Sequence, residues 1–156
     1  MKYYKYWDED SQISGGYTYL ETDEGWTIRQ ITVNGDSFFA SNVRYPPFSL
    51  CLADQQINYD DIDEVVPISQ QEFDEVWEKH LQQRRFIWNK VKQTCKVGSR
   101  IEGAIEIFFP HGVIVHLGND ALGVANYAEC KVSTKPEFMY PKHKVTATVS
   151  GYDEVN

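Results

Sequence analysis

Alternating apolar and polar positions dominate the first fifty residues and predict a small antiparallel sheet. Strands are expected over residues 17–21, 26–33 and 37–41, and the aromatic residues between positions 3 and 7 predict a further strand. Within 26–33, alternation puts every second residue on one face, which groups Thr27, Arg29, Ile31 and Val33. Asn34-Gly35 predicts a hairpin turn because both residues tolerate positive φ. A short strand is also expected at residues 48–52.

The apolar spacing changes to a helical period after Pro67. Ser69 is the expected N-cap, and Glu72 three residues later is the other half of a capping box. Apolar side chains then recur at helical spacing at Phe73, Val76, Trp77, Leu81, Trp88 and Val91, with Ile87 beside them. Acidic residues gather near the start and basic residues near the end, which suits the helix dipole. The helix is expected to end near Thr94 and to pack Trp77 and Trp88 on the sheet.

Short strands with turns between them follow from Val97 onward. They are expected over residues 99–109, 113–117, 122–127 and 144–150, with a linker containing Pro136 and Pro141 before the last. Gly103 interrupts the first of these strands, where it permits a bend or a close backbone approach. Bent strands in a small all-β segment are typical of a closed or nearly closed barrel.

Residues 95–156 resemble an S-one domain, the OB-fold repeat named after the largest protein of the bacterial small ribosomal subunit. The resemblance rests on the pairs and strands Val97-Gly98, Gly103-Ala104-Ile105, His111-Gly112 with 113–117, 123–126 and 145–153. It implies that RNA lies across the second and third strands with aromatic rings stacked on bases. His111 and Ile114 stand where the family has such rings, and Asn126 stands where it often has histidine.

The resemblance also implies a set of RNA contacts. Stacking, base and phosphate contacts are expected from Phe109, His111, Asn126, Lys131, Lys142 and Arg100. Alternation must point either Phe108 or Phe109 outward, so either one can supply the ring. The family's fifth strand would follow the turn at residues 153–154, close to the last residue given. We expect the gap to be filled by residues 3–7, by a second chain or by a C-terminal strand that raises the melting temperature.

Charge divides the chain into an acidic and a balanced part. The net charge is −8; residues 1–89 hold sixteen Asp/Glu against seven Lys/Arg, and residues 90–156 hold seven against eight. We therefore predict an α+β chain of two modules: an acidic sheet-plus-helix module over 1–92 and an OB-fold barrel over 93–156. The acidic module is expected to recruit a basic protein partner.

The sequence contains no recognisable catalytic, cofactor or metal motif. Cys51, Cys95 and Cys130 are widely spaced, and the histidines have no ligand spacing. The acidic run at residues 60–64 lacks the ligand order and the central glycine of an EF-hand. There is no signal peptide or membrane-spanning run, so we expect a cytoplasmic protein.

Two functional hypotheses remain. The leading one is a non-catalytic, RNA-binding or ribosome-associated protein that holds single-stranded RNA on the barrel. The alternative is a protein-interaction or regulatory module whose barrel no longer binds RNA, which the replaced stacking positions and the acidic composition favour.

Overall fold

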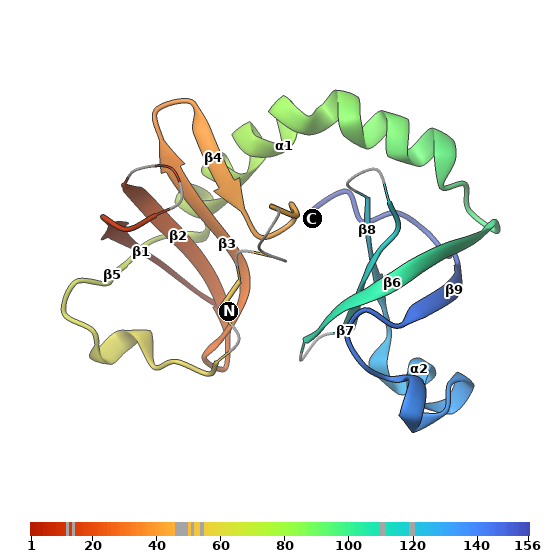
Figure 1. Ribbon diagram of the computed structural model, residues 1–156. Coiled ribbons are helices and arrows are strands. Elements are labelled where there is room, and N and C mark those ends of the chain that lie inside the picture. The colour runs from red at the N-terminus through yellow and green to blue at the C-terminus, as the bar shows by residue number, and fades with distance from the viewer. Residues whose placement is uncertain are drawn as a thin grey trace. The chain divides into compact units, whose positions relative to one another are not determined.

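A five-stranded antiparallel sheet with one helix builds the first part of the chain (Figure 1). The computed structural model describes residues 1–11, 13, 15–45, 50, 52–53, 55–109, 112–118 and 121–156. The sheet order is β4-β3-β2-β1-β5. The elements are β1 (Lys2–Asp8), β2 (Gly16–Asp23), β3 (Trp26–Asn34), β4 (Ser37–Ala40), the 3₁₀ turn η1 (Tyr59–Asp61), β5 (Val66–Pro67) and helix α1 (Gln70–Thr94). The strand expected at residues 48–52 lies largely outside the described residues.

The chain divides into two compact units, 1–85 and 86–156. The division falls inside α1, whereas the change in charge suggests a boundary after residue 92. Packing explains the difference, because the two ends of the helix have different neighbours. Phe73 and Trp77 belong to the core of the first unit, but the ring of Trp88 lies 5.9 Å from that of Tyr152 in the second. The expectation that Trp88 packs on the first sheet is wrong.

Both faces of the first sheet carry an apolar cluster. Ile31 and Ala40 pack with Phe73 and Trp77 on the face that meets α1. The opposite face contributes Tyr4 and Leu20, which pack against Tyr59 and its neighbours. Because the sheet is buried on both sides, its strands hold apolar residues and paired threonines instead of a polar outer face. The buried hydroxyls of Thr18 and Thr32, for example, lie 2.6 Å apart.

Two details of strand register differ from the sequence prediction. The pairing moves from Glu21↔Arg29 to Thr22↔Thr27, so a bulge at residue 28 turns Thr27 to the face opposite Arg29. There the Thr27 hydroxyl lies 2.9 Å from that of Tyr59. The hairpin after β3 forms where Asn34-Gly35 predicts one, but its loop is residues 35–36, since Asn34 pairs with Ser37. Of Asn34 and Gly35, only Gly35 has positive φ.

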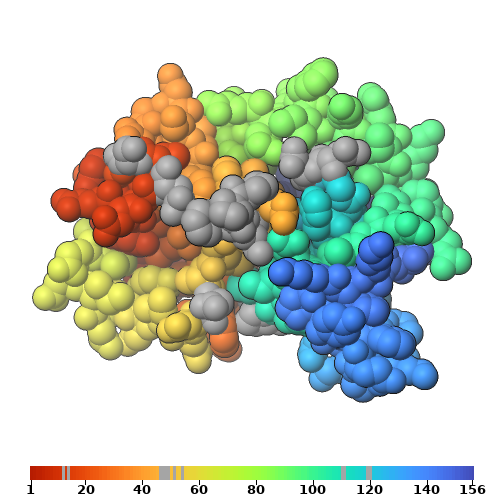
Figure 2. All heavy atoms as spheres, in the orientation of Figure 1, coloured from red at the N-terminus to blue at the C-terminus, as the bar shows by residue number. Residues whose placement is uncertain are grey.

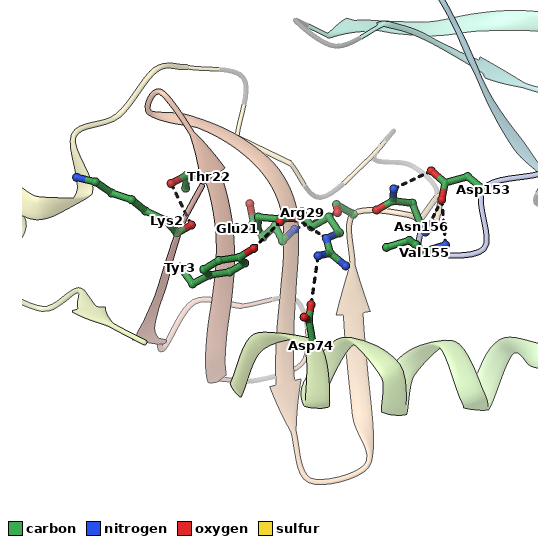
Figure 3. A network of polar contacts seen from close by, with 11 residues as sticks. Lys2, Tyr3, Glu21, Thr22, Arg29, Asp74, Asp153, Val155 and Asn156 are labelled. Carbon is green, nitrogen blue, oxygen red and sulfur yellow. Dashed lines mark hydrogen bonds and ion pairs between the residues drawn. The ribbon is translucent and has the colours of Figure 1, made fainter. Parts of the chain in front are cut away.

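A buried ion pair joins β2 to β3, and its arginine also pairs with a partly exposed carboxylate on α1 (Figure 3). Nε of Arg29 donates to Oε2 of Glu21 at 2.5 Å, and Nη2 of Arg29 lies 3.3 Å from Oδ1 of Asp74 on the helix. The Tyr3 hydroxyl donates to the other oxygen of Glu21 at 3.0 Å. The guanidinium also lies 4.8 Å from the centre of the Phe73 ring. Arg29 therefore has several partners for a charge that burial would otherwise penalise.

The start of α1 follows the predicted cap in part. The Ser69 hydroxyl accepts a hydrogen bond from the Glu72 N–H at 3.1 Å, as expected of an N-cap. The Glu72 carboxylate accepts from Lys5 Nζ at 2.7 Å on β1, so a tertiary ion pair engages the side chain expected to complete the capping box. The helix ends at Thr94, where the sequence predicts.

The second unit is a curled four-stranded sheet of order β8-β7-β6-β9. Three consecutive strands pair with their neighbours and the fourth returns beside the first, which is Greek-key connectivity. Its elements are β6 (Arg100–Phe109), β7 (Gly112–His116), β8 (Leu122–Ala125), helix α2 (Tyr127–Ser133), the 3₁₀ turn η2 (Pro136–Phe138) and β9 (Lys144–Thr148). Residues 3–7 do not extend this sheet, because they form β1 between β2 and β5.

Gly103 is required for the strands of the second unit to approach one another. A Cβ at this position would lie 2.7 Å from the His116 carbonyl oxygen and 2.8 Å from Cγ1 of Val115. Contacts this short with backbone cannot be relieved by moving a flexible side chain. The close approach that the sequence predicts at Gly103 is therefore confirmed.

Candidate nucleic-acid interface

One end of the second sheet brings several of the expected RNA contacts together. Phe109 ends β6 and pairs with Gly112 at the start of β7. Val113 pairs with Ala125 at the end of β8, and Asn126 follows immediately. Phe109 and Asn126 thus lie at the same sheet end, beside the beginning of α2. His111 is outside the described residues.

An aromatic and basic group forms where α2 begins. The Tyr127 ring lies 6.1 Å from the Phe108 ring in an edge-to-face arrangement. Nζ of Lys131, one helical turn along α2, lies 4.5 Å from the centre of the Tyr127 ring. We call Phe108, Tyr127 and Lys131 the Tyr127 cluster. Its central ring is 43% exposed, so a ligand can reach it beside a cation.

Asn126 acts as the N-cap of α2. Its Oδ1 accepts hydrogen bonds from the N–H groups of Ala128 at 2.9 Å and Glu129 at 3.1 Å. The side-chain NH₂ group is consequently the part that a base could contact. The sequence prediction missed this helix and extended the strand to residue 127. The spacing of Asn126 and Glu129 is the capping pattern that could have revealed it.

Lys142 and Arg100 occupy different places from the Tyr127 cluster. Lys142 lies in the turn before β9 with φ of 70°, and its N–H donates to the Ile105 carbonyl at 2.7 Å. Arg100 begins β6 and pairs with Thr148. A strand rises about 3.3 Å per residue, so Arg100 and Phe109, at opposite ends of β6, are up to about 30 Å apart. Arg100 therefore cannot share a short binding site with Phe109.

The surface of β7 and β8 is aliphatic where the family resemblance implies stacking rings. Ile114 pairs with Val124, which is 66% exposed. Val113 and Val115 point into the core with Ile105. Cys130 of α2 packs against the same core, and burial with Glu129 nearby raises the pKa of its thiol. The thiol therefore stays protonated at neutral pH and behaves as an apolar group.

Within the second unit, the C-terminal residues contact the last turns of α1. The Tyr152 hydroxyl donates to the carbonyls of Lys92 at 3.2 Å and Cys95 at 3.1 Å. Nε1 of Trp88 donates to the Glu154 carboxylate at 2.7 Å, and Lys92 pairs with the same group. These two contacts lower the pKa of Glu154, so the carboxylate is ionised at neutral pH.

The acidic run of the first unit is partly engaged within the protein. The Asp60 carboxylate pairs with Lys2 and accepts a 2.8 Å hydrogen bond from the Tyr4 hydroxyl. Lys2 and Tyr4 together lower the pKa of Asp60. Across the described ranges, no three His, Cys, Asp or Glu side chains are grouped closely enough to hold a metal ion.

Comparisons with known proteins leave the chain without an assigned relative. No family model matches the sequence, no curated protein matches it, and no solved structure matches the fold. Among the described helices, none combines the length and the apolar character needed to cross a membrane.

Proposed function

We propose that the second unit is an OB-fold-type domain that binds single-stranded RNA at the Tyr127 cluster. The observation that carries this proposal is Lys131 over the exposed Tyr127 ring, at the sheet end where Phe109 and Asn126 also lie. Greek-key connectivity and curling of the sheet support the OB assignment, because an OB-fold is a small, partly open Greek-key barrel.

The chemistry of the cluster suits an unpaired nucleotide. An exposed ring offers a face on which a base can stack, and such stacking contributes about 1–3 kcal/mol per base. Phe108 holds the Tyr127 ring from one side, which limits the motion that binding would have to arrest. The ammonium of Lys131 carries three donors, so it can bind a phosphate while it remains near the ring.

Charge distribution favours the second unit over the first for a polyanion. Seven acidic and eight basic residues give residues 90–156 a balance of +1, whereas sixteen and seven give residues 1–89 a balance of −9. RNA would be repelled by the acidic part and tolerated by the balanced one. We accordingly expect weak, salt-sensitive binding that depends on local contacts.

Anisotropy of a labelled single-stranded RNA of about 12 nucleotides, titrated with the full chain, tests this proposal. At about 50 mM salt we expect binding that weakens steeply by about 200 mM. Tyr127→Leu should weaken it about tenfold or more, while Arg100→Ala at the far end of β6 serves as the matched control. Absence of binding at low salt, or equal affinity in Tyr127→Leu and wild type, would refute the proposal.

The aliphatic surface of β7 and β8 favours the alternative, a protein-interaction module. Ile114 and Val124 form an apolar pair, and exposed apolar groups at the centre of a patch are typical of protein interfaces. The double variant Ile114→Thr, Val124→Thr should then abolish capture of a protein partner without changing RNA affinity. Loss of RNA affinity in this variant would instead place RNA on the strand surface.

A further inference from the structure

The connection from α2 to β9, which lies among the blue spheres of Figure 2, carries a second group of aromatic side chains. The Phe138 and His143 rings stack with centroids 5.1 Å apart and planes 5° from parallel. The Tyr140 ring lies 4.9 Å from that of His143. We call these three residues the His143 cluster. Phe138 is 43% and Tyr140 50% exposed, so neither ring is there to fill the core.

The backbone beneath the His143 cluster is tied to β6. The Ile105 N–H donates to the His143 carbonyl at 2.9 Å, and the Lys142 N–H donates to the Ile105 carbonyl at 2.7 Å. Met139, between the two exposed rings in sequence, packs against the core of the second unit. The rings are therefore held on the sheet by inward contacts of their neighbours. A ligand that stacks on them loses less free energy to ordering than it would on a mobile loop.

Positive charge is concentrated along the same connection. Residues 131–144 contain Lys131, Lys135, Lys142 and Lys144 against the single carboxylate of Glu137, in a chain whose net charge is −8. Lys142 also adopts φ of 70°, a conformation that glycine would reach more easily. A lysine at this position provides a cation directly before His143 at some conformational cost. The cations and the exposed rings thus lie on one short segment.

We propose that the His143 cluster is a base-stacking site for single-stranded RNA, with Lys142 and Lys144 contacting the flanking phosphates. The inference rests on the proposed RNA-binding function and adds to it a site on the α2–β9 connection. Rings combined with cations recognise unpaired nucleotides, since every base has a face that can stack. A protein partner fits less well, because lysine is depleted at protein–protein interfaces.

Two double variants of the full chain test the site. Phe138→Leu with Tyr140→Leu removes both exposed rings, and Phe138→Tyr with Tyr140→Phe retains both as the matched control. Binding is measured by anisotropy of a labelled oligouridine RNA of about 12 nucleotides at about 50 mM salt. We expect the leucine variant to lose about tenfold to a hundredfold in affinity, and the ring-retaining variant to bind like wild type. Urea denaturation confirms that both variants are folded.

The outcomes separate this inference from the proposed function. If wild type binds and the leucine variant binds equally well, the His143 cluster is not a stacking site, although RNA binding by the unit stands. If wild type shows no binding at low salt, both proposals are wrong. Ultraviolet crosslinking gives an independent readout, because a stacked base should attach to the tryptic peptide of residues 132–142. Adducts found only elsewhere in the chain would contradict the site.

Discussion

Acidification should destabilise the first unit through His80. This side chain is 3% exposed and lies against the rings of Phe38 and Trp77. Its Nε2 lies 2.8 Å from Oδ1 of Asn42, a distance that suits donation from a neutral imidazole. Burial, with Arg84 nearby, lowers the pKa of His80 from 6.5 to about 4. The folded protein therefore resists protonation that the unfolded chain accepts.

The size of the effect follows from the two pKa values. Between pH 6.5 and about 4 the unfolded state binds more protons than the folded state, so the free energy of unfolding falls as the pH falls. From about pH 7 to about pH 5 the loss amounts to about 2 kcal/mol. The contribution is fully present only above the unfolded pKa, and below about pH 4 the loss no longer grows.

Urea denaturation followed by tryptophan fluorescence measures this loss. Trp88→Phe as the background leaves tryptophans only at positions 7, 26 and 77, all within the first unit. His80→Gln is the comparison, because its amide can still donate to Asn42 and does not titrate. We expect wild type to lose about 2 kcal/mol more than His80→Gln between the two pH values. Equal losses in both proteins would show that His80 does not cause the pH dependence.

Three further substitutions test the packing. Gly103→Ala should destabilise the second unit by about 1–3 kcal/mol, because its Cβ would meet the His116 carbonyl; unchanged amide exchange in β6 would contradict this. Glu21→Gln should cost about 1–3 kcal/mol, because Arg29 loses its buried carboxylate partner but keeps Asp74, and an unchanged urea midpoint would argue against that pairing. Tyr152→Phe should lower stability by about 1 kcal/mol, because it removes a hydroxyl that donates to carbonyls near the end of α1. An unchanged melting temperature would contradict this.

Local patterns in the sequence predict most of the elements. Alternation locates the strands of the first sheet, and Ser69 with the helical spacing after it locates α1 at both ends. The side of β3 on which Thr27 lies could not be predicted this way. A bulge at residue 28 reverses it, and a bulge depends on how two strands pair, not on the alternation within one.

The candidate site shows the same limit. Phe109, Asn126 and Lys131 come from the family resemblance, and the structure places them around one end of the second sheet. The strand predicted over residues 99–109 already puts Arg100 and Phe109 at opposite ends, so the sequence alone could have separated Arg100 from the other residues. The sequence did not point to the rings of Phe138 and Tyr140, because the segment that carries them, with Pro136 and Pro141, was expected to be a linker.

Trp88 illustrates why the boundary between the units could not be read from periodicity. Its spacing from Trp77 places both side chains on one helical face, yet their partners belong to different units. The apolar face of a helix predicts that its side chains are buried, but it does not predict which surface covers them.

RNA binding by the second unit can be tested residue by residue with an amide chemical-shift titration of the full chain with single-stranded RNA. We expect perturbations concentrated at residues 126–131 and 138–144, with little change in the first unit or at Arg100. The perturbations should shrink as salt rises from about 50 to about 200 mM. Perturbations confined to β7 and β8, or none at low salt, would show that the Tyr127 and His143 clusters do not bind RNA.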